Sequence, residues 1–218
     1  MSRGLGDVYK RQYIDRYFEK KEYDRVLQVL DESIELDKAY RGQVLEYNQK
    51  KKEIYRLQGN KSAYIEQLWK LVLEQSAGDL DIYKELKAQY SEKEWLIKRE
   101  ELFKKLPANA HIDRLYKEEK LYDRLLAYVL KSSGLYAVQT YENVLKKEYP
   151  KQILSKYQGE VNKMASCTGN RKHYADLVAL LRRMKQIKGG SEIVETIVEE
   201  WKIKYRNRPA MMDELSKL

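Results

Sequence analysis

Few residues in this sequence have the type and spacing needed for chemistry. The 218-residue chain has two histidines, His111 and His173, and one cysteine, Cys167. Neither histidine has a second histidine or a cysteine at metal-ligand spacing. The local pairs with Asp113 and Asp176 are interpreted as ordinary surface or rim arrangements. The single cysteine excludes an intrachain disulfide, fits a reducing compartment, and is expected to be a small core residue.

Carboxylates and glycines do not supply a catalytic pattern either. Acidic residues alternate with lysine and arginine, as in the run 117–120, which is typical of a solvated helix face making weak pairs. The pair Gly189-Gly190 lacks the Lys-Ser or Lys-Thr of a phosphate-binding loop. The sequence therefore predicts no catalytic, cofactor-binding or metal-binding residue, and a protein that is not an enzyme.

Positive charge is concentrated in the last third of the chain. The net charge is +9, and residues 150–218 hold 14 basic and 8 acidic side chains. The candidate basic surface consists of two runs, each expected to close a helix: Arg182, Arg183, Lys185 and Lys188, then Lys202, Lys204, Arg206 and Arg208. Cations at helix C-termini interact favourably with the macrodipole, which explains part of the pattern. The alternative is a surface that attracts phosphates, although antiparallel neighbours would put the two runs on opposite sides.

The elements that position these residues are all expected to be helices. Three prolines and ten glycines interrupt the chain, and no alternating run bounded by hairpin turns appears. A seven-residue stretch, 21–27, returns as 120–126, each with apolar residues at helical spacing. A second pair, Gly59-Asn60 and Gly169-Asn170, precedes equivalent tyrosines. Repeats of this kind predict an all-α, tetratricopeptide-like α-solenoid of stacked antiparallel helix pairs.

Three segments are expected along the chain. Residues 2–12 resemble the translation of a DNA-sequencing adapter, so 1–12 is expected to be non-native and disordered or artefactual. The native chain is then expected to begin near Tyr13 and to extend upstream. Pro107 separates an N-terminal helical-repeat lobe, 13–106, from a C-terminal lobe, 107–218, which ends in a capping helix.

Several stretches carry a resemblance to a known family: 169–174, 180–184 and 205–215, with 120–126 and 148–150. They are similar to the C-terminal helical region of bacterial SWIM zinc-finger proteins. That family is named for a Cys-x-Cys…Cys-x-His zinc module, proposed to bind nucleic acid or protein, that usually lies upstream of this region. The resemblance implies a helical-repeat tail whose zinc would belong to the missing upstream module, and with one cysteine no zinc ligand transfers to this chain.

The expected function is a non-catalytic protein-interaction scaffold that accepts a protein or peptide partner, without a cofactor of its own. The alternative is an accessory nucleic-acid-binding module that uses the basic C-terminal third. A third hypothesis is a regulatory repeat domain that senses a peptide signal. No apolar stretch approaches the ~20 residues that span a bilayer, so a cytoplasmic protein without membrane contact is expected.

Overall fold

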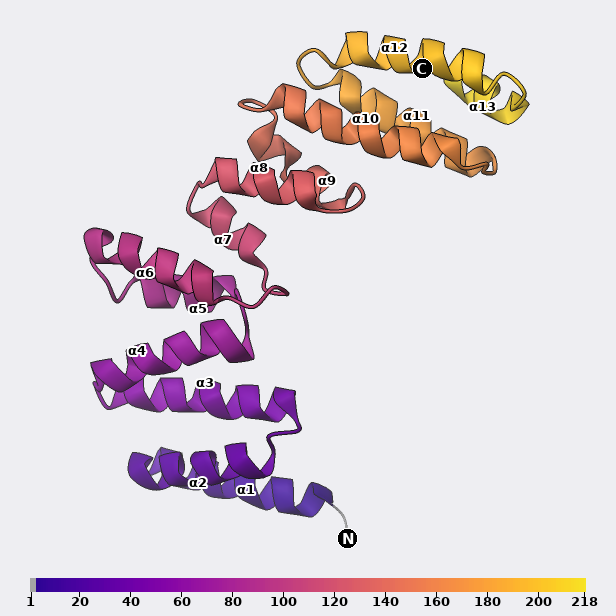
Figure 1. The fold of residues 1–218 in the computed structure, drawn as a ribbon. Helices are drawn as coiled ribbons and strands as arrows, with labels where there is room; N and C mark the ends of the chain where they lie inside the picture. Colours follow the sequence, from indigo (N-terminus) through magenta and orange to yellow (C-terminus); the bar gives the residue numbers. More distant parts are fainter. Residues whose placement is uncertain (1–2) are drawn as a thin grey trace. The chain divides into compact units, whose positions relative to one another are not determined.

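The structure is a computed structural model that describes the backbone of residues 3–218 and the side chains of residues 9–218. Helices account for 76% of the chain, and the described residues contain no strand. The predicted all-α class is therefore confirmed. The chain divides into two compact units, Met1–Glu118 and Glu119–Leu218, and the elements of each are labelled in Figure 1.

The first unit is a succession of helices, most of which pack on a neighbour along the chain. Its elements are α1 (Arg3–Glu19), α2 (Tyr23–Leu36), α3 (Arg41–Leu57), α4 (Lys61–Lys70), the π-helix η1 (Leu71–Gln75), α5 (Leu80–Lys87), α6 (Glu92–Lys105) and α7 (Ile112–Glu118). Contacts run from α1 to α2, α2 to α3, α3 to α4 and α4 to α5, and α5 also contacts α7. This neighbour-to-neighbour order follows from helices that each have one apolar stripe to bury.

Two apolar clusters fill the first unit. The first joins α1, α2 and α3 and consists of Ile14, Val26, Leu30, Tyr47 and Ile54. The second joins α4, η1, α5, α6 and α7 and consists of Tyr64, Leu68, Leu71, Val72, Ile82, Tyr83, Leu86, Trp95, Leu102 and Leu115. Tyr83 is fully buried, and its ring meets the Trp95 ring edge-on at 5.1 Å between centroids. Such aromatic pairs add to the stability gained by burial alone.

The second unit is also a succession of helices. Its elements are α8 (Tyr122–Lys131), α9 (Tyr136–Leu145), α10 (Pro150–Ser166), α11 (Arg171–Lys185), α12 (Gly190–Lys204) and α13 (Pro209–Leu215). Each helix from α8 to α12 contacts the next, and α13 packs on α11. The last contact includes ion pairs from Arg171 to Asp213, at 2.7 Å, and to Glu214, at 2.8 Å.

The two copies of the repeated seven-residue stretch share a backbone feature that the sequence did not predict. Lys21 and Lys120 occupy the same place in the repeat, and both have left-handed backbones, with φ of 59° and 55°. Among the described residues no other non-glycine residue has a positive φ. At the start of the first copy, where α1 ends, Glu22 N donates to Tyr17 O and Lys21 N to Phe18 O, the pattern of a Schellman turn. The repeat therefore conserves a helix-ending turn as well as an apolar stripe.

The second repeated pair, Gly59-Asn60 and Gly169-Asn170, has the same helix cap in both copies but a different glycine conformation. Asn60 and Asn170 each cap a helix by accepting a backbone N–H three residues on, and each is followed by a buried tyrosine. Gly59 has the predicted left-handed conformation, with φ of 68°, whereas Gly169 does not.

Three features differ from the sequence-based expectations. The units divide after Glu118, whereas the sequence placed the lobe boundary before Pro107; α7 packs on α5, and its Leu115 belongs to the second cluster of the first unit. Helix α1 begins at Arg3, so it includes residues 3–12 of the segment that resembles an adapter, while residues 1–2 lie outside the described part. The prediction of a buried Cys167 is wrong: it is exposed at the C-cap of α10, because the helix ends just before it.

Candidate interaction groove

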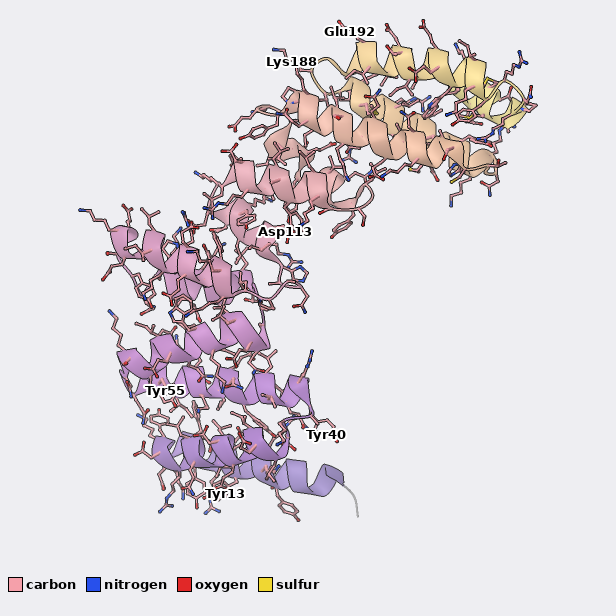
Figure 2. All side chains as sticks on the ribbon, viewed as in Figure 1. Tyr13, Tyr40, Tyr55, Asp113, Lys188 and Glu192 are labelled. Atoms are coloured by element: carbon pink, nitrogen blue, oxygen red, sulfur yellow. The ribbon has the colours of Figure 1, made fainter. Side chains whose placement is uncertain are left out.

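The first unit has an open groove of about 910 Å³ along one edge. Its lining comes from the α2–α3 turn, the start of α3, the α4–η1 segment, the loop 76–79, the loop before α7, and α7 itself. Figure 2 labels Tyr40 in the α2–α3 turn and Asp113 on α7. The residues that follow them in sequence, Arg41 and Arg114, line the groove. The volume is at the upper end of the ~300–1,000 Å³ of typical ligand sites.

The π-helical turn η1 shapes one wall of the groove. It continues α4, and Ser76 N donates to Leu71 O, the i-to-i+5 bond of a π-helix. Leu71 and Val72 point into the core, while Leu73 and Glu74 line the groove. Single π-turns inside α-helices occur often at functional sites, because the wider turn redirects side chains.

Gly78 brings two loops together at the groove. Its φ is 76°, a left-handed conformation that glycine adopts without strain. A Cβ atom placed there would lie 2.9 Å from the backbone nitrogen of His111. The loop 76–79 and the loop before α7 therefore approach as closely as a residue without a side chain permits.

The groove is lined by charged side chains, which we call the rim, and by apolar side chains, which we call the floor. Lys38, Arg41, Lys70 and Arg114 supply positive charge, while Glu35, Glu74 and Asp79 supply negative charge. The Asp79 carboxylate already caps α5 by accepting the backbone N–H groups of Asp81 and Ile82, each at 3.0 Å. The floor consists of Ile34, Val44, Leu73 and Pro107.

A buried amide pair fixes the helices behind the groove. Asn48 on α3 donates to Val44 O at 2.7 Å, and Gln67 on α4 donates to both the backbone and the side-chain oxygen of Asn48, at 3.0 and 2.9 Å. Asn48 is fully buried, so each unmade hydrogen bond here would cost about 1–3 kcal/mol. The register of α3 against α4, and with it the groove wall, is therefore specified by polar contacts as well as by apolar packing.

The first predicted basic run lies at the end of α11 and in the turn after it. Arg183 is half-buried, and its Nε donates to Glu142 at 2.9 Å and its Nη2 to Gln139 O at 3.1 Å. Arg182 donates to Lys217 O at 2.6 Å. Lys188 is in the α11–α12 turn, next to the start of α12 where Figure 2 labels Glu192.

The second run lies at the other end of α12. Fifteen helical residues, Gly190–Lys204, separate the two ends by about 22 Å. Arg208 donates to the carbonyl oxygens of Ala165 and Cys167 and stacks on the Tyr205 ring, and Lys204 lies over that same ring. Arg206 is exposed.

The structure thus brings only part of the predicted basic surface together. Lys185 and Lys202 line one small pocket of about 250 Å³, and Glu195 and Glu199 line it with them.

Arg183 belongs to a buried polar network. Glu142 also accepts a hydrogen bond from the Tyr157 hydroxyl, at 2.5 Å. Burial and this bond raise the pKa of Tyr157, so the phenol stays protonated and keeps donating. The bond to Glu142 raises the pKa of Arg183 further above its already high value. A cation that sequence analysis assigned to a binding surface is thus engaged in packing α11 against α9 and α10.

The other chemistry-bearing residues remain separate. His111 is exposed at the groove, and His173, on α11, lies 3.1 Å from Met164 O. No group of three or more histidine, cysteine, aspartate or glutamate side chains in the described part of the chain is arranged to hold a metal ion. With one exposed cysteine, the residues present do not fit the family's zinc module.

Sequence reasoning missed the groove because no short pattern marks it. Its lining spans residues 34–114 and includes a π-turn that α-helical periodicity does not predict. The only local signal was the break at Ser76-Ala77-Gly78, where the glycine is now seen to have a structural requirement.

Searches against protein-family models, curated proteins and solved structures each found no match. Within residues 3–218, no helix combines the length and the apolar character needed to cross a bilayer. The fold class and the groove therefore stand as the observations from which a function is to be inferred.

Proposed function

We propose that this chain is a non-catalytic protein-interaction scaffold built as a tetratricopeptide-like α-solenoid of stacked antiparallel helix pairs. The packing order supports the proposal, because within each unit most helices contact the next helix along the chain. The repeated turn at Lys21 and Lys120 and the repeated caps at Asn60 and Asn170 support a common repeating unit. Repeat proteins of this kind bind partners along surfaces formed by successive repeats.

The groove of the first unit is the observation that carries the functional part. An apolar floor within a charged rim is the pattern of a protein-binding surface, in which the floor contributes affinity and the rim contributes specificity. The lining comes from several consecutive helices and not from one loop, so the groove is a property of the stacked arrangement.

The rival proposal is an accessory nucleic-acid-binding module in the basic C-terminal third. Two of its arginines, Arg183 and Arg208, already donate to groups of this chain, and the two basic runs lie at opposite ends of α12. These contacts favour a structural role for part of the positive charge. The relation to SWIM zinc-finger proteins stays a hypothesis that rests on the sequence motifs alone.

The test compares protein capture with nucleic-acid binding. The full chain is immobilised and incubated with a nuclease-treated lysate of the source organism, and the proteins that it captures are quantified by mass spectrometry. The control is Leu68→Asp, which places a charge at a fully buried position and destroys the helical packing. In parallel, fluorescence anisotropy measures binding to a DNA and RNA panel at ~50 and ~200 mM salt, where a phosphate-binding surface loses affinity steeply.

We expect the folded chain to capture a defined set of proteins that the unfolded control does not capture. We also expect the folded chain to bind nucleic acid only weakly. The scaffold proposal is wrong if no protein is enriched over the unfolded control. The rival is favoured if nucleic acid binds with a steep salt dependence that Arg206→Glu, a change at an exposed residue, reduces.

A further inference from the structure

The groove of the first unit holds positive charge that the chain itself does not neutralise. Lys38, Arg41, Lys70 and Arg114 line it, and within the described residues none of their side chains makes an ion pair or a hydrogen bond. Other cations of the same unit are paired between helices, as Lys52 of α3 is with Glu85 of α5 at 2.6 Å.

The negative groups of the groove do not balance this charge. Asp79 is committed to the N-terminus of α5, so Glu35 and Glu74 are the carboxylates left to face the four cations. Glu35 is three residues from Lys38 in sequence, and Glu74 is four residues from Lys70. Arg41 and Arg114 have no carboxylate of the groove within four residues of them in sequence, and they approach the groove from α3 and from α7.

The shape and the floor restrict what could bind. The groove is open, and its apolar floor includes Ile34, Val44 and Leu73. An extended peptide can place side chains alternately on the floor and at the rim. Arginine is suited to carboxylates, because its planar guanidinium can donate two parallel hydrogen bonds.

We propose that this groove binds an extended acidic peptide segment of a partner protein, with its carboxylates on Arg41 and Arg114 and an apolar side chain on the floor. This inference rests on the proposed scaffold function and names the chemistry of its partner. A nucleic-acid strand fits less well, because it carries a phosphate at every nucleotide and Glu35 and Glu74 would repel some of them. A peptide can present neutral residues at those two positions.

The test is fluorescence anisotropy on the full chain with a labelled, end-blocked peptide in which glutamates alternate with leucine and serine. Its matched probe has every glutamate replaced by glutamine. The key variant is Arg41→Glu with Arg114→Glu. The control is Arg16→Glu with Arg56→Glu, which reverses two exposed arginines of the same unit outside the groove.

We expect the glutamate peptide to bind about tenfold more tightly than the glutamine peptide, because two rim-exposed ion pairs are lost in the latter. The Arg41/Arg114 variant should lose at least about the same factor, since it also adds repulsion. The Arg16/Arg56 control should stay within about twofold of the original protein, because charges outside the groove act only through screened long-range attraction.

Equal weakening in both double variants would overturn the inference, since it would indicate general charge attraction. So would tighter binding of a single-stranded oligonucleotide that depends on Arg41 and Arg114, which would make the groove a nucleic-acid site. Ala77→Trp fills the groove without changing charge and should abolish peptide binding while circular dichroism stays helical. Retained peptide binding in that variant would place the site elsewhere.

The outcomes separate this inference from the scaffold proposal. If the chain captures a partner whose binding survives both Ala77→Trp and the Arg41/Arg114 variant, the groove inference fails and the scaffold function stands. If the chain captures no protein, the scaffold function itself fails.

Discussion

Replacing Arg183 should loosen the second unit, although the sequence assigns this residue to a binding surface. In Arg183→Gln the Nε–H bond to Glu142, 2.9 Å, and the Nη2–H bond to Gln139 O, 3.1 Å, are both lost. Glu142 is then left in a buried site with the Tyr157 hydroxyl as its remaining donor among these contacts.

The expected magnitude follows from the burial of the two partners. Breaking a fully buried ion pair costs about 3–5 kcal/mol, because the remaining charge is uncompensated. The Glu142 side chain is 8% exposed but that of Arg183 is 38% exposed, so water can replace part of the lost interaction. We therefore expect a loss of about 2 kcal/mol in the free energy of unfolding.

Hydrogen exchange followed by mass spectrometry measures this loss locally, in the helices that contact Arg183. Peptides from α9, α10 and α11 should exchange about 30-fold faster in the variant, the factor that corresponds to ~2 kcal/mol. The matched control is Arg182→Gln, which removes an adjacent, exposed arginine whose side chain bonds to the backbone oxygen of Lys217. It should cost no more than about 0.5 kcal/mol. Equal exchange in the two variants would refute the structural role of Arg183.

Three further predictions test other parts of the structure. Gly78→Ala should lower the free energy of unfolding by about 1–3 kcal/mol, because the new side chain adds backbone strain and a clash. Gly134 has a similar φ but open space around it, so Gly134→Ala should lower that free energy by only about 1 kcal/mol. Urea unfolding of the two variants measures the difference. Asn170→Ala should cost about 1 kcal/mol and speed exchange in the first turn of α11, and Asn170→Ser should restore most of the protection. Hydrogen bonds from Lys217 and from an arginine of α11 lower the pKa of Glu214 below its usual 4.5. The ionised Glu214 therefore stabilises the folded state fully above pH 4.5, and this stabilisation is lost as the pH falls through the lowered pKa. The difference in melting temperature between the original protein and Glu214→Gln should therefore close at low pH, and a gap that persists there would contradict this assignment.

The elements that sequence reasoning predicted well depend on residues close together in the chain. A serine three residues before a glutamate, as at Ser91 and Glu94, predicts a capping box, and a proline such as Pro150 is typical of a helix's first turn; the structure has both features. Each involves groups no more than a few residues apart, so the signal survives without knowledge of the fold.

The features that the sequence did not predict depend on distant contacts or on rare local conformations. Arg183 and Glu142 are 41 positions apart, so nothing near Arg183 shows that it is paired. Cys167 follows the last turn of α10 and is exposed there, and only the position of the helix end decides this. A left-handed lysine at position 21 or 120 could not be predicted, since this conformation is uncommon outside glycine and asparagine.

The order of helix contacts has a consequence for how the chain folds as it is synthesised. Because α2 contacts α1 and α3 contacts α2, and later helices such as α13 pack on a helix two places earlier, most new helices find a partner in a segment that left the ribosome shortly before. Short loops between contacting elements favour fast folding. Such a chain can bury its apolar stripes while translation continues, so little hydrophobic surface stays exposed until the far end of the sequence has been synthesised.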